Sequence, residues 1–187
     1  MRSSLSMNTN LFLKLCVITL ILSACNNSDD QLPPNTQVQV APSSYTWTVT
    51  EFLNSEGQCI YSNDVYQDTV VQISVLDSDD RPIGEVDISM YLSPSNSTSP
   101  VEFDNEYVFY LYDDFNGNGV VDHPQELVSS TGDSILYEAH TEKYHGTKSM
   151  IIRTNTSCGG FRATLNVFAG SAYGSMEIST ETRDDSI

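Results

Sequence analysis

The chain has 187 residues, and its 25 acidic side chains against 8 lysines and arginines give a formal net charge of −17 at pH 7. A charge of this sign repels nucleic acid and anionic lipid headgroups, so we expect no nucleic-acid partner. It favours solubility, cation binding or a basic partner, and it is also typical of an acidic surface that meets only solvent. The length is that of one domain with a hydrophobic core.

The first 24 residues have the layout of a secretory signal. Arg2 and Lys14 precede an apolar run, "LCVITLILSA" at residues 15–24, which is too short to span a membrane as a helix. The run leads into "LSAC", residues 22–25, which resembles the lipobox of bacterial lipoproteins. The resemblance implies cleavage before Cys25, a diacylglycerol on its thiol, and N-acylation of the new terminus, for example by palmitate. An ordinary signal peptide with an incidental cysteine is the alternative.

A lipid on Cys25 predicts stable anchoring in a membrane, because each buried methylene contributes about 0.8 kcal/mol. The next residue is Asn26 and not Asp, which in lipoproteins of this kind favours the outer membrane of a Gram-negative cell. Cleavage removes two basic residues and no acid, and it leaves 163 of the 187 residues with a formal charge of −19. We therefore expect a lipid-anchored protein of the cell envelope.

The mature chain is expected to have three parts. Residues 25–44 are predicted to be a flexible tether, because "NNSDDQLPPNTQVQVAPSS" is polar, contains three prolines and shows no apolar periodicity. A β-sandwich domain is expected at 45–180, and a polar tail at 181–187.

Apolar side chains recur at every second position through the domain, which predicts strands with one buried face. No stretch keeps helical spacing for longer than a turn or two. The predicted fold is therefore all-β, a single antiparallel sandwich of about 7–9 strands. The segments expected to form strands are 45–53, 68–77, 85–92, 106–114, 134–142, 148–155, 161–170 and 174–180.

Two stretches resemble bacterial immunoglobulin-like domains. "VVQISVLDSDDRPIGEVDISMYLS" reads like the opening strands of such a module, and "YHGTKSMIIRTN" followed by "RATLNVF" reads like its closing strands. The likeness covers roughly residues 66–170 and rests on pattern. It implies an immunoglobulin-like sandwich used for adhesion, spacing or scaffolding, with no catalytic residue to transfer. A transthyretin-like or other prealbumin-type sandwich fits the same pattern.

The cysteines divide by their place in the chain. Cys16 lies in the signal and Cys25 takes the lipid, so Cys59 and Cys158 remain as a pair in an oxidising compartment. We expect them to form a disulfide, with two free thiols as the alternative. In the chain-entropy model, closing a loop of roughly 100 residues stabilises a protein by about 4.7 kcal/mol, and usually by less in practice.

Catalytic chemistry has little support in the sequence. The three histidines are His123, His140 and His145, and no cysteine or closely spaced histidine completes a transition-metal site with them. No nucleophile motif, zinc-protease motif or phosphate-binding glycine loop is present. We expect that the protein is not an enzyme.

One stretch carries the spacing of a calcium loop. In "DFNGNGVVDHPQE", acidic and amide side chains alternate around two glycines, as in the EF-hand and dockerin loops that this stretch resembles. The resemblance implies calcium as cofactor and the ligands Asp114, Asn116, Asn118, Val120 through its backbone carbonyl, Asp122 and Glu126.

Two features depart from that family. Its usual acidic position holds Gln125, with Glu126 one residue late, and the preceding segment is predicted to be a strand and not a helix. Asp122 and Gln125 are expected to be the N-cap and N3 residues of a helix that begins after the loop. The alternative for the whole stretch is a β-hairpin whose Asn-Gly pairs form a primed turn.

The function predicted from these features is non-enzymatic. We expect a membrane-anchored envelope lipoprotein that presents an immunoglobulin-like module for protein binding, adhesion or envelope assembly. A calcium-dependent carbohydrate- or matrix-binding module is the first alternative, and a hydrolase-type enzyme is the second. The expected partners are the membrane, through the N-terminal lipid, and a protein of the envelope or cell surface.

Overall fold

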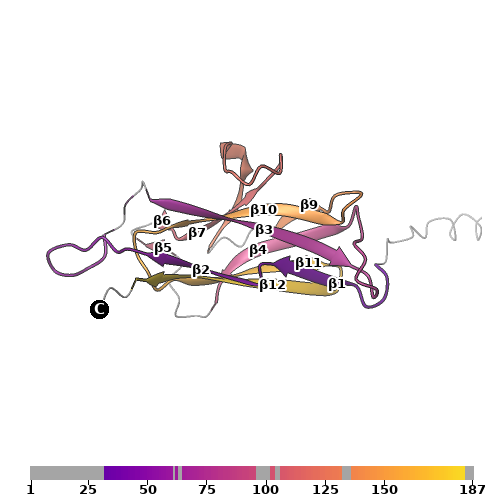
Figure 1. Ribbon diagram of the computed structural model, residues 1–187, viewed down its shortest axis with the longest axis horizontal. Coiled ribbons are helices and arrows are strands. Elements are labelled where there is room, and N and C mark those ends of the chain that lie inside the picture. Colours follow the sequence, from indigo (N-terminus) through magenta and orange to yellow (C-terminus); the bar gives the residue numbers. More distant parts are fainter. Residues whose placement is uncertain are drawn as a thin grey trace, which may run out of the picture. The chain divides into compact units, whose positions relative to one another are not determined.

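The computed structural model of the chain describes residues 32–60, 62, 65–95, 102–103, 106–131 and 136–183. The predicted signal at 1–24, the predicted acylation site Cys25 and Asn26 lie outside these residues. The described residues form β-strands with a single short 3₁₀-helix, η1 (Figure 1). None of the helical residues described makes a segment long and apolar enough to cross a membrane.

Ten of the strands form two five-stranded sheets that pack as a β-sandwich. The first sheet has the order β1(Gln37–Ala41), β3(Tyr66–Leu76), β10(Thr147–Asn155), β7(Phe109–Asp113), β8(Leu127–Ser130). The second sheet has the order β2(Ser44–Val49), β12(Ala172–Thr182), β11(Arg162–Ala169), β4(Asp87–Pro94), β9(Tyr137–His140). A separate pair is formed by β5(Glu102–Phe103) and β6(Glu106–Tyr107), and η1 spans Pro124–Glu126.

The strand order is that of an immunoglobulin fold. Across the first sheet, β1-β3-β10-β7 occupies the places of strands A, B, E and D, and across the second, β4-β11-β12 occupies those of C, F and G. The remaining strands widen the sheets: β8 and β9 extend one edge of each, and β2 pairs in parallel with β12. The predicted all-β sandwich is confirmed, with ten strands in its two sheets where about 7–9 were expected.

The core lies between the two sheets and follows the predicted alternation. Trp47 from β2 packs against Phe109 from β7, with 6.0 Å between the ring centroids. The largest fully buried side chains are Phe109, Ile73, Ile88, Met90, Leu92, Leu111, Met150, Ile151, Ile152, Leu165, Met176 and Ile178. These come from both sheets, so the apolar faces that the sequence marked are the faces that meet.

The predicted tether at 25–44 is wrong at its C-terminal end. Val38 and Val40 of β1 are buried, and β1 pairs antiparallel with β3 in the register Gln37↔Leu76. The stretch was assigned to the tether because of its three prolines, and the alternation of Gln and Val in β1 is only five residues long. The domain therefore includes residues 37–44. At the other end β12 continues to Thr182, past the expected boundary at 180.

The predicted segments each contain a strand, but their ends differ. β2 stops at Val49, because residues 50–60 leave the sheet as a long connection. β8 was not predicted, since its four residues, "LVSS", are too short to show a period. β7 buries only one face, with Phe109 and Leu111 in the core and Tyr110 partly exposed.

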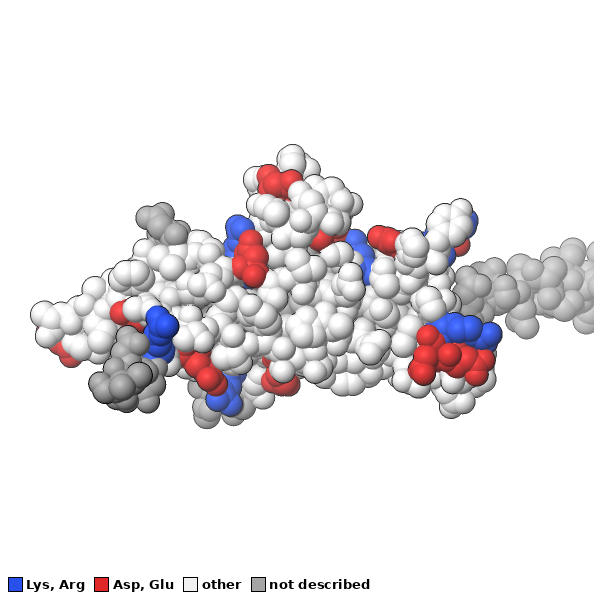
Figure 2. All heavy atoms as spheres, in the orientation of Figure 1, with Lys and Arg blue, Asp and Glu red and all other residues white. Residues whose placement is uncertain are grey.

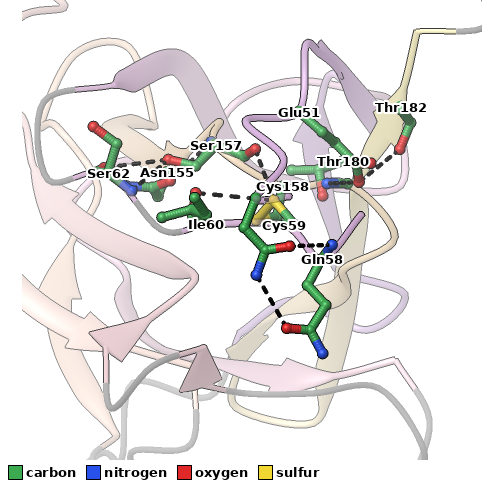
Figure 3. The surroundings of a disulfide bond; sticks show 12 residues. Glu51, Gln58, Cys59, Ile60, Ser62, Asn155, Ser157, Cys158, Thr180 and Thr182 are labelled. Carbon is green, nitrogen blue, oxygen red and sulfur yellow. Dashed lines mark hydrogen bonds between the residues drawn. A yellow bond between two sulfur atoms is a disulfide. The ribbon is translucent and has the colours of Figure 1, made fainter. Parts of the chain in front are cut away.

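A disulfide between Cys59 and Cys158 fixes the connection after β2 (Figure 3). The two cysteines are 99 residues apart in sequence, and their Cα atoms are 5.9 Å apart. Hydrogen bonds flank the bridge: the Asn155 amide donates to the carbonyl of Ser62 at 2.7 Å, and the Gly159 amide donates to Glu51 at 3.1 Å. The disulfide thus joins the loop after β2 to the β10–β11 connection.

Candidate cation-binding loop

The predicted calcium stretch is the connection between β7 and β8. It begins at Asp114, directly after β7, and ends with η1, directly before β8. In Figure 1 this segment projects away from β10 and β3, and Figure 2 shows acidic side chains on the projecting lobe. The two strands that carry the loop pair antiparallel, with a register shift between Leu111 and Tyr112. The loop is therefore held at both ends by one sheet.

The base of the loop covers the outer face of that sheet. Met150, Ile151 and Ile152 are consecutive in β10 and all fully buried, so both faces of the strand are covered there. A Cβ atom added to Gly119 would lie 3.0 Å from Cγ2 of Val70 on β3. Val70 is the partner of Ile151 in the β3–β10 register. The loop thus packs against the outer side of β3 and β10.

Asp114 connects the loop to the sheet. Its side chain is 5% exposed, and its Oδ2 accepts hydrogen bonds from the Ser149 hydroxyl at 2.8 Å and the Gly119 amide at 3.2 Å. Its second oxygen, Oδ1, is buried and has no hydrogen-bond partner within the part of the chain that the structure describes. Among the described residues no lysine or arginine forms an ion pair with this carboxylate. A buried carboxylate oxygen without a partner is costly unless a cation or water completes it.

Two amide side chains and Asp122 form the outer part of the loop. Asn116 Oδ1 accepts from the Asn118 amide at 3.0 Å, and Asn118 Oδ1 accepts from the Val120 amide at 2.8 Å. Both side-chain amides also donate to Asp122 Oδ2, from Asn118 at 3.0 Å and from Asn116 at 3.3 Å. These hydrogen bonds, that of Asn118 first, lower the pKa of the Asp122 carboxyl below its usual value. Asp122 therefore stays ionised at neutral pH.

The expected helix after the loop is a 3₁₀ turn that begins one residue later than predicted. Its N-cap is His123, and N3 is Glu126 and not Gln125, because Pro124 occupies the first position of the turn. Glu126 is 1% exposed, and its Oε2 accepts from the amides of Asp122 and His123, both at 3.1 Å. The carboxylate that the calcium hypothesis placed in the ligand set thus caps the backbone.

The structure brings some of the predicted ligands together and leaves others apart. Asn116, Asn118 and Asp122 contact one another, whereas Asp114 lies against the sheet and Glu126 contacts the backbone just before η1. Within the described ranges, no three His, Cys, Asp or Glu side chains gather around one point that could hold a metal ion. An ion in this loop would therefore need amide and carbonyl oxygens as well. Such an oxygen-only donor set suits calcium and does not suit zinc or copper.

A second acidic site lies next to the loop and was not predicted. Asp113 is 1% exposed and accepts hydrogen bonds from the Lys148 ammonium and the Tyr137 hydroxyl. Burial, and then the Asp113 carboxylate, raises the pKa of Tyr137 above its usual value, so the phenol stays a donor. Lys148 also lies 5.8 Å from the ring centroid of Phe115. Because Lys148 is paired with Asp113, it does not neutralise Asp114.

No protein-family model matches the chain, and no curated protein matches it. Among solved structures it is similar to one titled "Structure of the N-terminal domain of PorA", with a TM-score of 0.35 and 12% sequence identity. That match covers 79% of this chain and 97% of the other. Similarity at this level does not carry a function from one protein to the other.

Proposed function

We propose that this protein is a lipid-anchored binding module of the bacterial cell envelope whose β7–β8 loop binds calcium. The observation that carries the calcium proposal is the buried Oδ1 of Asp114, which has no hydrogen-bond partner among the described residues and lies in a loop rich in oxygen atoms that can bind a cation. A bound calcium ion supplies the positive charge that this oxygen lacks. The module is non-catalytic and presents its sandwich for adhesion at the envelope.

Each loop residue has a role in this proposal. Asp114 and Asp122 supply the two charged oxygens, and the Asn116 and Asn118 side chains supply neutral ones. The carbonyl of Val120 completes the set. Glu126 acts indirectly, because its carboxylate holds the amides of Asp122 and His123 and so fixes the exit of the loop. With two charged ligands, affinity is expected in the weaker range typical of extracellular calcium sites.

Calcium titration by calorimetry tests this proposal. We expect heat of binding for the full-length acylated protein in mild detergent, and a higher melting temperature in millimolar calcium. Asp114→Asn and Asp122→Asn should each weaken binding at least tenfold, since each removes a full charge from the site. Asp80→Asn is the matched control, because Asp80 is an exposed aspartate in the β3–β4 turn. A wild-type protein that shows neither heat nor thermal stabilisation would leave the loop as a plain turn.

Anchoring of the module rests on the lipobox-like residues 22–25. The sandwich starts by Gln37, so only a short stretch separates it from Cys25. At about 3.5 Å per residue, these residues reach at most roughly 40 Å when fully extended. The domain would therefore act close to the membrane surface, within reach of the other components of the envelope.

A further inference from the structure

Three aromatic rings form a cluster on the outer face of the second sheet. Met90, Leu92, Leu165 and Val167 point into the core, so Tyr91 of β4 and Phe168 of β11 point outward. Tyr173 of β12 pairs with Phe168 in the β11–β12 register and is 52% exposed. The ring centroids of Phe168 and Tyr173 are 5.1 Å apart, and those of Tyr91 and Phe168 are 6.2 Å apart at an angle of 11°.

Hydrogen bonds beneath the rings hold this aromatic cluster in place. The Tyr173 hydroxyl donates to Asn166 Oδ1 at 3.0 Å, and Asn166 Nδ2 donates to the Ser93 hydroxyl at 2.9 Å. Asn166 is only 9% exposed, so its amide is a fixed part of the sheet surface. Because three neighbouring strands are tied in this way, a ligand that stacks on the rings would not have to order them first.

A polar strip runs beside the aromatic cluster on the same face. Thr164 pairs with Glu177 on β12 and donates to its carboxylate at 3.0 Å. Ser95 donates to the other oxygen of Glu177, also at 3.0 Å. The rings therefore lie toward one end of this face, and hydroxyl and carboxylate groups lie toward the other, with Asn166 between them.

The charge of this face disfavours anionic ligands. Its described residues include the carboxylate of Glu177, and the basic residue at its end, Arg162, lies 3.9 Å from Glu181. The aliphatic side chains of these strands are in the core, so the face offers few of the contacts that protein interfaces use beyond aromatic rings. A sugar ring suits it better, because its C–H groups stack on the negative face of an aromatic ring. Its hydroxyls can exchange hydrogen bonds with the polar strip.

We infer that the outer face of β4, β11 and β12 binds a neutral polysaccharide. This inference names the ligand of the binding module proposed above, and it rests on that proposal only for the protein's role at the envelope. Tyr91, Phe168 and Tyr173 provide the stacking surface, and Asn166 positions Tyr173. The calcium loop lies on the opposite sheet, so the ion takes no direct part in holding the sugar.

Affinity gel electrophoresis of the full-length acylated protein tests the inference. The gels contain glucomannan, hydroxyethylcellulose or xyloglucan as neutral probes, and alginate as an anionic one. We expect retardation by at least one neutral polymer and none by alginate. Tyr173→Ala should weaken binding about tenfold, the effect of losing one aromatic anchor. Tyr173→Phe keeps the ring and should lose less.

The controls separate this inference from the calcium proposal. Tyr144→Ala removes an 83% exposed tyrosine in the β9–β10 turn and should leave retardation unchanged. Retardation that persists in EDTA is expected, whatever the calorimetry shows for the loop. The inference is overturned if the folded protein runs freely in all three neutral gels, if alginate alone retards it, or if Tyr173→Ala binds like wild type. Capture of a protein through Tyr173 without glycan binding would overturn it as well.

Discussion

Among single residues, the adjacent aspartates at the end of β7 have different roles. Asp113 points to the core side of the sheet, where the Lys148 ammonium neutralises its charge and the Tyr137 hydroxyl donates a hydrogen bond to it. Asp114 points to the outer side, where, of the described residues, one hydroxyl and one amide donate hydrogen bonds to it. Alternation along a strand thus gives one carboxylate a charged partner and leaves the other without one among the described residues, with its Oδ1 buried.

The Lys148–Asp113 pair gives a prediction at this scale. Lys148→Met should destabilise the protein by about 3 kcal/mol, because it leaves a 1% exposed carboxylate without its cation. Lys143→Met is the matched control: Lys143 pairs with Glu85 at 3.4 Å, but both side chains are more than half exposed, so the loss should be about 0.5 kcal/mol or less. Urea unfolding monitored by fluorescence measures both. Equal losses in the two variants would mean that Asp113 is not held by Lys148.

At the scale of elements, β1 moves the start of the domain from the predicted residue 45 to residue 37. It covers the edge of β3, and it also lies against β12, because a Cβ atom on Gly174 would come within 2.5 Å of the Val38 carbonyl. Only glycine allows this approach. The strand therefore belongs to the packed domain and is not part of the tether.

Substitution in β1 tests this assignment. Val40 is 6% exposed, so Val40→Ala should lower the free energy of unfolding by about 2 kcal/mol. Gln39→Ala, at the neighbouring exposed position, should change it by less than about 0.5 kcal/mol. Thermal or urea unfolding distinguishes the two. If residues 37–41 were a free tether, both variants would unfold like wild type.

At the scale of the whole molecule, we propose a lipid anchor, a short tether and a sandwich with two separate binding surfaces. The cation loop extends from the sheet that contains β3 and β10, and the aromatic cluster lies on the sheet that contains β11 and β12. A ligand on one sheet therefore does not block the other. This arrangement suits a module that stays on the membrane while it holds a polymer.

Localisation is the prediction at this scale. Wild-type protein should partition with membranes and into detergent, and Cys25→Ser should lose both properties, because a thioether-linked lipid cannot form on serine. Cys16→Ser, within the same signal, is the control and should behave like wild type. Cell fractionation with detergent phase separation measures the outcome. A Cys25→Ser protein that still enters the detergent phase would refute the lipid anchor.

The sequence by itself determined the fold class, because a period of two in hydrophobicity is local and needs no tertiary information. It also located the β7–β8 loop, since Asp114, Asn116, Asn118 and Gly119 lie within six consecutive residues. The two unassigned cysteines, Cys59 and Cys158, were enough to expect their pairing.

Only the tertiary structure decided which of these side chains meet. Glu126 caps the backbone just before η1, which the geometry of the turn decides, and Asp113 pairs with Lys148, which pairing between β7 and β10 brings near. The outward cluster of Tyr91, Phe168 and Tyr173 could not be predicted from the sequence either. Its members come from three strands, and the strand register brings them together. Sequence periodicity shows which side chains of one strand share a sheet face, but pairing between distant strands decides which side chains of different strands lie next to one another on it.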